Sequence, residues 1–299
     1  METVSIIMPC YNDGQYIEEA VASLRAQTYA PLELILVDDG SDDSNTLKAI
    51  NHLQFPHLKK LHTDHIGPSA ARNHGIAAAQ GKCILPLDAD DKIEPTYIEK
   101  AVAILEEKQE IGIVYCYADF LGKKTGPWQL PEYTLKEMLL GNVIFTSAMF
   151  RKADWAEAGG YRTTMENGLE DYDFWLSLLE LGREVYQIPE VLFHYRIKAA
   201  SRSTKFQSNM EGVQEAYRQL YYNHQAFYQK HCDMYIMALR EKNIDQTFTI
   251  DRLLNNQILL ERLFPFIKAL KGLPWLKKMI RKRLQGDMEG HAENEKEER

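Results

Sequence analysis

Two aspartates separated by one small residue, Asp88-Ala89-Asp90, follow an apolar run from Cys83 to Leu87. A buried strand that ends in this way delivers two carboxylates at its carboxyl end, where open α/β sheets bind their ligands. Carboxylate oxygens are hard ligands that hold Mg²⁺ or Mn²⁺ against a phosphate-bearing substrate. Such a triplet occurs by chance in many chains, and its weight comes from the strand and helix pattern around it.

The chain has two further pairs of adjacent acidic residues that could take part in the same chemistry, Asp38-Asp39 and Glu170-Asp171. The first pair ends the apolar run 32–37, so neighbouring parallel strands would place it in the same crevice as Asp88. Several carboxylates in one crevice repel each other unless a cation joins them. A divalent metal with a phosphorylated ligand would remove this repulsion.

Residues beside these acids have the chemistry to bind a nucleotide. Asp39 could accept a hydrogen bond from the N3–H of a uracil ring, because a buried base needs such a partner. Pro9 and Tyr11 end the first apolar run and could flank the base, with Tyr11 stacked on it. Arg72 could balance phosphate or acidic charge. Alone, Tyr11 would fit a core tyrosine and Arg72 a surface ion pair, so the interpretation depends on their joint arrangement.

Structural roles for the acids stay open. Asp38-Asp39-Gly40-Ser41 has the composition of a plain turn. Asp91 and Glu94 have the spacing of a capping box for the next helix, and we take this as the role of Asp91. Glu170-Asp171 would also favour a helix N-terminus through the helix dipole.

Apolar periodicity predicts the elements that must position these residues. Continuous apolar runs predict strands buried on both faces, and stripes at i, i+3, i+4 and i+7 predict helices. The predicted strands are 4–8, 32–37, 58–62, 83–87, 113–117, 148–150 and 185–188, and the predicted helices are 17–24, 45–53, 69–79, one from Pro95, 170–181 and 210–239. The alternation predicts an α/β fold with a mixed, mainly parallel sheet flanked by helices. The Gly- and Pro-containing stretch 121–133 is typical of a loop.

The alternation ends near residue 205. We expect an α/β domain over 1–205, a helical C-terminal region over 206–286 and a charged, disordered tail over 287–299. Within the second region, 262–285 interleaves basic with apolar and aromatic residues. That pattern is typical of a helix on an anionic membrane surface, and the alternative is a helix packed on the first domain.

Composition excludes some classes of protein. The net charge of −8 argues against a general nucleic-acid binder. Four separated cysteines without a C-x-x-C pair argue against a zinc ribbon and suit a reducing cytoplasm. The start of the chain lacks a signal-peptide pattern, and no apolar run is long enough for a membrane span. We therefore expect a cytoplasmic protein that lies on the inner face of the membrane if 262–285 binds lipid.

Several blocks together resemble glycosyltransferase family 2, the inverting nucleotide-sugar transferases of the GT-A fold. The blocks are Val4–Asn12, Leu36–Asp43, Gly67–Gly75, Leu87–Asp91, Gly159–Tyr161, Glu170–Leu176 and Ile188–Glu190. They cover about two thirds of the chain in the order expected for the family. Where the family often has Asn two residues before the third block, this chain has His65. It also lacks the Q-x-x-R-W motif of processive members.

The resemblance implies roles for the site residues. Pro9, Tyr11, Asp39 and Arg72 would bind the nucleotide. Asp88 and Asp90 would bind a Mn²⁺ or Mg²⁺ ion and the diphosphate, with Ala89 between them and Asp90 as the more direct ligand.

By the same resemblance, Asp171 would be the general base, with Glu170 beside it. Arg202 and Ser203, with His194 as a weaker candidate, would belong to a loop that closes on the diphosphate. The alternative for that loop is a solvated linker.

The expected function is transfer of a sugar from a nucleotide-sugar donor, with UDP favoured over GDP and dTDP, to a hydroxyl of a glycan or lipid-linked acceptor in cell-surface polysaccharide synthesis. Two alternatives stay open. A sugar nucleotidyltransferase would have a glycine-rich, basic turn after the first strand, whereas this chain has Tyr11-Asn12-Asp13-Gly14. A non-catalytic nucleotide-sugar-binding protein would not need all the acids named above.

Overall fold

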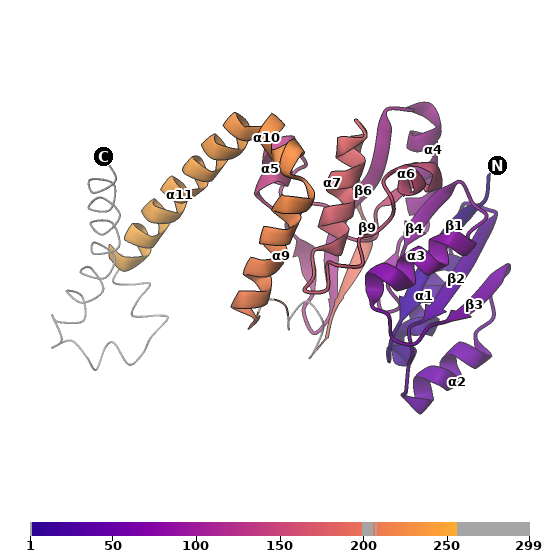
Figure 1. Cartoon of the computed structure of the whole chain (residues 1–299). Helices are drawn as coiled ribbons and strands as arrows, with labels where there is room; N and C mark the ends of the chain where they lie inside the picture. The colour runs from indigo at the N-terminus through magenta and orange to yellow at the C-terminus, as the bar shows by residue number, and fades with distance from the viewer. Residues whose placement is uncertain (1, 199–205, 207, 256–299) are drawn as a thin grey trace, which may run out of the picture. The chain divides into compact units, whose positions relative to one another are not determined.

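The computed structural model describes residues 2–198, 206 and 208–255 of the chain. Figure 1 shows the helices and strands along the chain. They are β1 (Val4–Cys10), α1 (Gly14–Arg25), β2 (Leu32–Asp38), α2 (Ser44–His52), β3 (Leu58–His62), α3 (Pro68–Ala78), β4 (Cys83–Pro86), β5 (Lys92–Ile93), α4 (Tyr97–Glu107), β6 (Ile111–Gly122), β7 (Gly126–Trp128), α5 (Leu135–Leu140), β8 (Met149–Arg151), α6 (Lys152–Glu157), α7 (Glu170–Glu180), β9 (Glu184–Ile197), α9 (Met210–Asn223), α10 (Gln225–Lys230) and α11 (Cys232–Asn255).

The strands of the described residues form one mixed sheet in the order β3-β2-β1-β4-β8-β6-β9-β5, with β7 paired to β6. Strands β3, β2, β1 and β4 are parallel, as are β6 and β9, whereas β8 runs antiparallel to both β4 and β6. Helices pack on the sheet, with α3 against β1 and β2 and with α4 and α7 against β6 (Figure 1). The predicted α/β fold with a mixed sheet flanked by helices is confirmed.

Burial explains why the first strands form where the apolar runs predict them. Every residue of β2 is buried, as expected for a parallel strand covered on both faces. Its one charged interior residue, Glu33, accepts hydrogen bonds from Ser5 Oγ at 2.5 Å and from the Gln80 N–H at 2.9 Å. Helix α2 begins after Asp43, whose carboxylate accepts the Thr46 N–H at 2.7 Å as an N-cap.

The stretch 121–133 is not wholly a loop, so that prediction was wrong in part. Residues Gly126–Trp128 form β7, which pairs with the extended end of β6. The Trp128 ring stacks on Phe120 at 5.4 Å between centroids, which supplies an apolar contact that a turn-rich composition conceals. Strands β6 and β9 also run further than their apolar centres, because their polar ends pair with each other.

Three helices, α9, α10 and α11, occupy the region where one long helix was expected. The breaks lie at His224 and His231, whose φ angles of −121° and −108° are not helical. His224 is buried, and its Nε2 lies 3.2 Å from Asp173 of α7. Helix α9 is thus tied to α7 and is not a free appendage.

The chain divides into two compact units, one ending at Ala238 and one beginning at Leu239. The boundary expected near residue 205 falls among residues that the structure does not describe and stays a prediction. The segments 262–285 and 287–299 also lie outside the described residues. Among the helices that the structure describes, none has the length and apolar character needed to cross a membrane.

Candidate functional site

Acidic residues gather at the carboxyl ends of the parallel strands. Strand β2 ends at Asp38, and Asp88 follows β4, with β1 between these two strands. The two acidic clusters therefore flank the end of β1, at one edge of the sheet. This is the edge at which open α/β sheets bind ligands.

Asp39 is buried and organises the loop that follows β3. Its carboxylate accepts hydrogen bonds from Thr63 Oγ1 at 2.7 Å, from the Ile66 N–H at 2.7 Å and from the Gly67 N–H at 3.0 Å. A carboxylate has about four acceptor positions, so one further donor can still bind. Gly40 allows the close packing here, because a Cβ at its φ of +77° would lie 2.7 Å from the His65 nitrogen.

Tyr11 and His65 form a pair of rings beside Asp39. Their centroids are 4.0 Å apart, and the Tyr11 side chain is exposed. His65 Nδ1 lies 3.6 Å from the Asp39 carboxylate. The histidine at the position where the family often has asparagine therefore lies beside Tyr11 and Asp39, two residues expected to bind the nucleotide. Pro9 is half-buried in β1, opposite Val37.

Arg72 connects the Asp88 triplet to the acidic pair on α7. Its buried guanidinium donates to Asp88 Oδ1 at 2.9 Å and to Glu170 Oε1 at 3.1 Å. Burial alone would lower the pKa of Arg72, but the carboxylates of Asp88 and Glu170 hold that pKa well above its ordinary value. The Nε atom is buried and has no hydrogen-bond partner among the residues that the structure describes.

The other aspartate of the triplet faces a different cation. Asp90 Oδ2 lies 2.7 Å from the Lys198 ammonium, which also lies 2.7 Å from Asp13 Oδ1. Burial raises the pKa of Asp90, and the nearby charge of Asp88 raises it further. Ala89, between the two acids in the chain, is almost fully buried. Asp88 contacts Arg72, and Asp90 contacts Lys198.

The expected capping role of Asp91 is wrong. Helix α4 begins at Tyr97, after Thr96, and no side chain caps it. The buried Asp91 carboxylate instead accepts the Arg196 N–H from the end of β9 at 2.8 Å. The reason is that the short strand β5 follows Asp91 directly, which leaves no helix start within reach.

Asp171 has the environment of a general base. It lies in the first turn of α7, where Thr146 Oγ1 donates to its Oδ2 at 2.8 Å and the Tyr172 N–H to its Oδ1 at 2.7 Å. Burial, with the negative charge of the adjacent Glu170, raises the pKa of Asp171 to about 6. A base is most effective when its pKa lies near the working pH.

The basic segment 194–203, expected as the loop at the diphosphate, reaches the site through Arg196 and Lys198, which were not singled out within it. Arg196 donates from Nε to the Asp90 carbonyl at 2.7 Å, and Lys198 contacts the Asp90 carboxylate. His194 turns away, with its Nδ1 on Asp119 and its Nε2 on Glu94. The signal in the sequence was the basic, hydroxyl-rich composition of 194–203, which does not say which of its residues reach Asp90.

Arg202 and Ser203 lie outside the described residues, so their expected role stays a prediction. The structure brings Pro9, Tyr11 and Asp39 together at one side of the β1 end. It brings Arg72, Asp88, Asp90 and Glu170 together at the other side.

The acids fit a metal only in combination with a phosphorylated ligand. Among the described residues, no cluster of three His, Cys, Asp or Glu side chains could hold a metal ion. Mg²⁺ commonly binds through one or two carboxylates together with substrate phosphates and water, which two aspartates can supply. The half-buried Asp90 carboxylate already faces one cation, the Lys198 ammonium at 2.7 Å.

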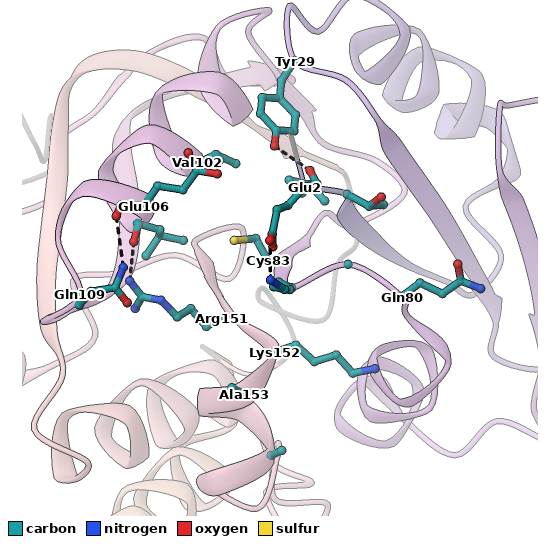
Figure 2. Close-up of a pocket in the computed structure, with 16 residues that line it drawn as sticks. Glu2, Tyr29, Gln80, Cys83, Val102, Glu106, Gln109, Arg151, Lys152 and Ala153 are labelled. Atoms are coloured by element: carbon teal, nitrogen blue, oxygen red, sulfur yellow. Dashed lines mark hydrogen bonds and ion pairs between the residues drawn. The ribbon is translucent and has the colours of Figure 1, made fainter.

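A second concave region lies at the opposite, amino ends of the strands. This pocket of about 640 Å³ is lined by residues that include Glu2 before β1, Cys83 at the start of β4, and Arg151 and Lys152 (Figure 2). Its cations bind the protein itself, since Arg151 donates to the Leu105 carbonyl at 2.6 Å and Lys152 to the Ala79 carbonyl at 2.6 Å. The acids predicted to do chemistry are absent from its lining.

Comparison with known proteins adds a family and a fold. Residues 5–160 match the family model described as glycosyl transferase family 2. The chain is 37% identical over 128 residues to an uncharacterized glycosyltransferase, YibD, of Escherichia coli (strain K12), covering 42% of this chain and 37% of that protein. It is 30% identical over 190 residues to the chondroitin synthase of Pasteurella multocida (strain Pm70), covering 60% of this chain and 19% of that protein.

The chain thus spans well under two thirds of these two relatives. A solved structure of S. aureus TarS (residues 1–349) in complex with UDP-GlcNAc has a similar fold, with a TM-score of 0.61 and 20% identity. The similarity covers 75% of this chain and 66% of that one.

Proposed function

The chain belongs to glycosyltransferase family 2, and we propose that it moves a sugar from a nucleotide-diphosphate donor to a hydroxyl group with inversion at the anomeric carbon. Its fold is of the GT-A type, and its family is one of glycosyltransferases, so the family match favours glycosyl transfer over the sugar nucleotidyltransferase alternative. One observation carries the proposed mechanism. The buried Arg72 links Asp88, on the donor side, to Glu170, the neighbour of the candidate base.

The donor would lie across the end of β1. Its base would stack near Tyr11 and His65 and donate to the open acceptor position of Asp39, with Pro9 beside it. UDP is the first candidate because the Asp39 carboxylate suits the N3–H of uracil, and because TarS was solved with UDP and with UDP-GlcNAc. Arg72 would hold Asp88 in position for the metal that the diphosphate would also bind.

Transfer needs the acceptor oxygen to lose a proton as it attacks the anomeric carbon from the face opposite the diphosphate. Asp171 would take that proton, and Thr146 holds its carboxylate in place. General-base assistance of this kind contributes roughly 10²–10⁴-fold. A Mn²⁺ or Mg²⁺ ion bound by Asp90, Asp88 and the diphosphate would stabilise the charge that develops on the leaving group.

The acceptor is a glycan or a lipid-linked glycan of a cell-surface polysaccharide in this proposal. Support comes from the similarity to a chondroitin synthase. Residues 262–285 would hold the protein on the anionic inner face of the membrane, where a lipid-linked acceptor is found. Co-sedimentation with phosphatidylglycerol vesicles tests this part, because binding that persists at high salt or is absent at low salt contradicts an electrostatic contact.

A donor panel tests the central proposal. Release of nucleoside diphosphate is measured from UDP-, GDP- and dTDP-sugars, with and without Mn²⁺, on the wild type and on Asp171→Asn. A ligand that binds only the native state also raises the thermal midpoint, which separates binding from turnover. Absence of both binding and release for every sugar nucleotide would contradict the proposal.

A further inference from the structure

Lys198 occupies an unusual position at the end of β9. Its ammonium lies 2.7 Å from Asp90 Oδ2 and 2.7 Å from Asp13 Oδ1, and its side chain is only 17% exposed. The ring of Tyr16 lies below it, with 5.8 Å from the nitrogen to the ring centroid. Two carboxylates and an aromatic face thus enclose one positive charge, which is the surrounding that stabilises a cation.

Two cations of the site, Arg72 and Lys198, each pair with two carboxylates. Arg72 serves Asp88 and Glu170, and Lys198 serves Asp90 and Asp13. Each cation therefore reduces the repulsion between the two carboxylates that it contacts.

These two cations differ in how firmly they are held. Arg72 projects from α3, is buried and has a planar fork fixed by two carboxylates. Lys198 follows the last residue of β9 and carries its charge on a flexible four-carbon stem. Lys198 is therefore the cation that can exchange its partner.

We propose that Lys198 stands in for the divalent metal at Asp90 in the free enzyme and gives up this carboxylate when the donor binds. The diphosphate offers the ammonium new oxygen partners, and Asp90 becomes available to the metal. Metal binding then depends on the donor, which prevents a strong metal site from forming without substrate. This inference rests on the proposed donor and metal chemistry.

A purely structural role for Lys198 makes a different prediction. If the ion pairs only anchor the end of β9 on the loops after β1 and β4, then removing the charge lowers stability and leaves metal affinity unchanged. If Lys198 competes with the metal, then removing its charge increases the affinity of the free protein for Mn²⁺. The two roles therefore separate in a measurement that contains no donor.

The experiment measures Mn²⁺ binding to the full chain by the electron paramagnetic resonance signal of free Mn²⁺. Wild type, Lys198→Met, Lys198→Arg and the double variant Lys198→Met with Asp90→Asn are compared without nucleotide. We expect Lys198→Met to bind Mn²⁺ about tenfold more tightly or better, because a competing unit charge is gone. Lys198→Arg keeps the charge and should match the wild type, and the double variant should lose the gain.

Addition of UDP gives a second readout. The wild type should bind Mn²⁺ more tightly when UDP is present. Lys198→Met should gain less affinity, because its Asp90 carboxylate is available to the metal even without UDP. Equal Mn²⁺ affinities for wild type and Lys198→Met without nucleotide overturn the inference. Thermal unfolding checks that each variant is folded, and Lys198→Gln replaces Lys198→Met if that variant is not.

Failure of the inference differs from failure of the proposed function. The Mn²⁺ titration needs no sugar donor, and the donor panel needs no Lys198 variant. If Lys198→Met binds Mn²⁺ more tightly than the wild type but no nucleoside diphosphate is released from any donor, the role of Lys198 is supported and the transferase mechanism is contradicted. Release with unchanged Mn²⁺ affinity would do the reverse.

Discussion

The cations at the two ends of the sheet have different partners. At the carboxyl ends, cations meet carboxylates, as Arg72 does with Asp88 and Glu170. At the amino ends, Arg151 donates to the backbone carbonyls of Leu105 and Lys108, at 2.6 and 3.1 Å, and lies only within 3.8 Å of a carboxylate, that of Asp154. A backbone carbonyl at the end of a helix needs a hydrogen-bond donor from outside the helix. The Arg151 guanidinium supplies such donors, so its role is structural. A set of paired side-chain charges can instead be rearranged by a ligand.

This contrast explains why a large pocket is not by itself the candidate site. The amino-end pocket has volume, but its cations are engaged by backbone carbonyls or, for Lys82, by an ion pair with Glu2. The carboxyl-end site has raised carboxyl pKa values at Asp90 and Asp171. Perturbed titratable groups with named charge partners are the stronger indication of chemistry.

The largest effect is expected for Asp171→Asn at the carboxyl end. Turnover should fall by roughly 10²–10⁴-fold because the acceptor proton loses its base, while UDP affinity stays close to that of the wild type. Steady-state nucleotide release and a UDP titration measure the two quantities. The control is Asp119→Asn, a residue that contacts His194 outside the site. Near-normal turnover in Asp171→Asn would remove Asp171 as the base.

A smaller effect is expected for Asp90→Asn. The affinity for UDP in the presence of Mn²⁺ should fall by about tenfold or more, because a proposed carboxylate ligand of the metal would be replaced by a neutral amide. Without Mn²⁺, UDP affinity should change much less. Isothermal titration under both conditions makes the comparison, and an equal loss with and without Mn²⁺ would mean that Asp90 does not act through a metal.

The pH profile should show the state of Asp171 directly. The base must be deprotonated, so kcat/KM should fall about tenfold per pH unit as pH decreases below about 6. The folded pKa is raised above its ordinary 3.8, so the folded state holds this proton more tightly than the unfolded chain does. The contribution of Asp171 to stability is therefore lost as pH rises from about 4 to 6.

Asp171→Asn should consequently be at least as stable as the wild type at pH 7, as thermal midpoints at pH 5 and pH 7 would show. A profile that stays flat down to pH 4.5 would contradict both the raised pKa and the role of this carboxylate.

The sequence predicted the parts of the site that depend on strand ends. Asp39 and Asp88 are placed by β2 and β4, whose continuous apolar runs fix where each strand stops. Asp171 begins a helix with a clear apolar register. In these cases a local pattern determines the position of the side chain, and the parallel pairing brings the strand ends together.

The parts that the sequence did not predict depend on long-range pairing. Lys198 reaches Asp90 only because β9 pairs with β6 far beyond its apolar centre, with register shifts near Tyr117. Asp91 takes its partner from the same strand end, 105 residues away along the chain. No local spacing reports such contacts, so a capping box was the nearest local explanation for Asp91.

The smallest effect on activity is expected at the amino end, where Arg151→Met tests the other half of the comparison. Removing the guanidinium leaves the carbonyls of Leu105 and Lys108 without this donor, which should lower the free energy of unfolding by about 1–3 kcal/mol. Urea unfolding measures this change, and UDP affinity and turnover should stay within about twofold of wild type, the range of small remote effects.

Arg72→Met is the matched variant at the carboxyl end. It strands the carboxylates of Asp88 and Glu170, so it should lower both stability and UDP affinity. If Arg151→Met instead lowers UDP affinity while stability is unchanged, then the amino-end pocket is coupled to nucleotide binding, and Arg151 does not have a purely structural role. If the two arginine variants differ only in stability, the link from the donor motif to α7 is structural, and Asp171 is positioned by Thr146 and the Tyr172 N–H without Arg72.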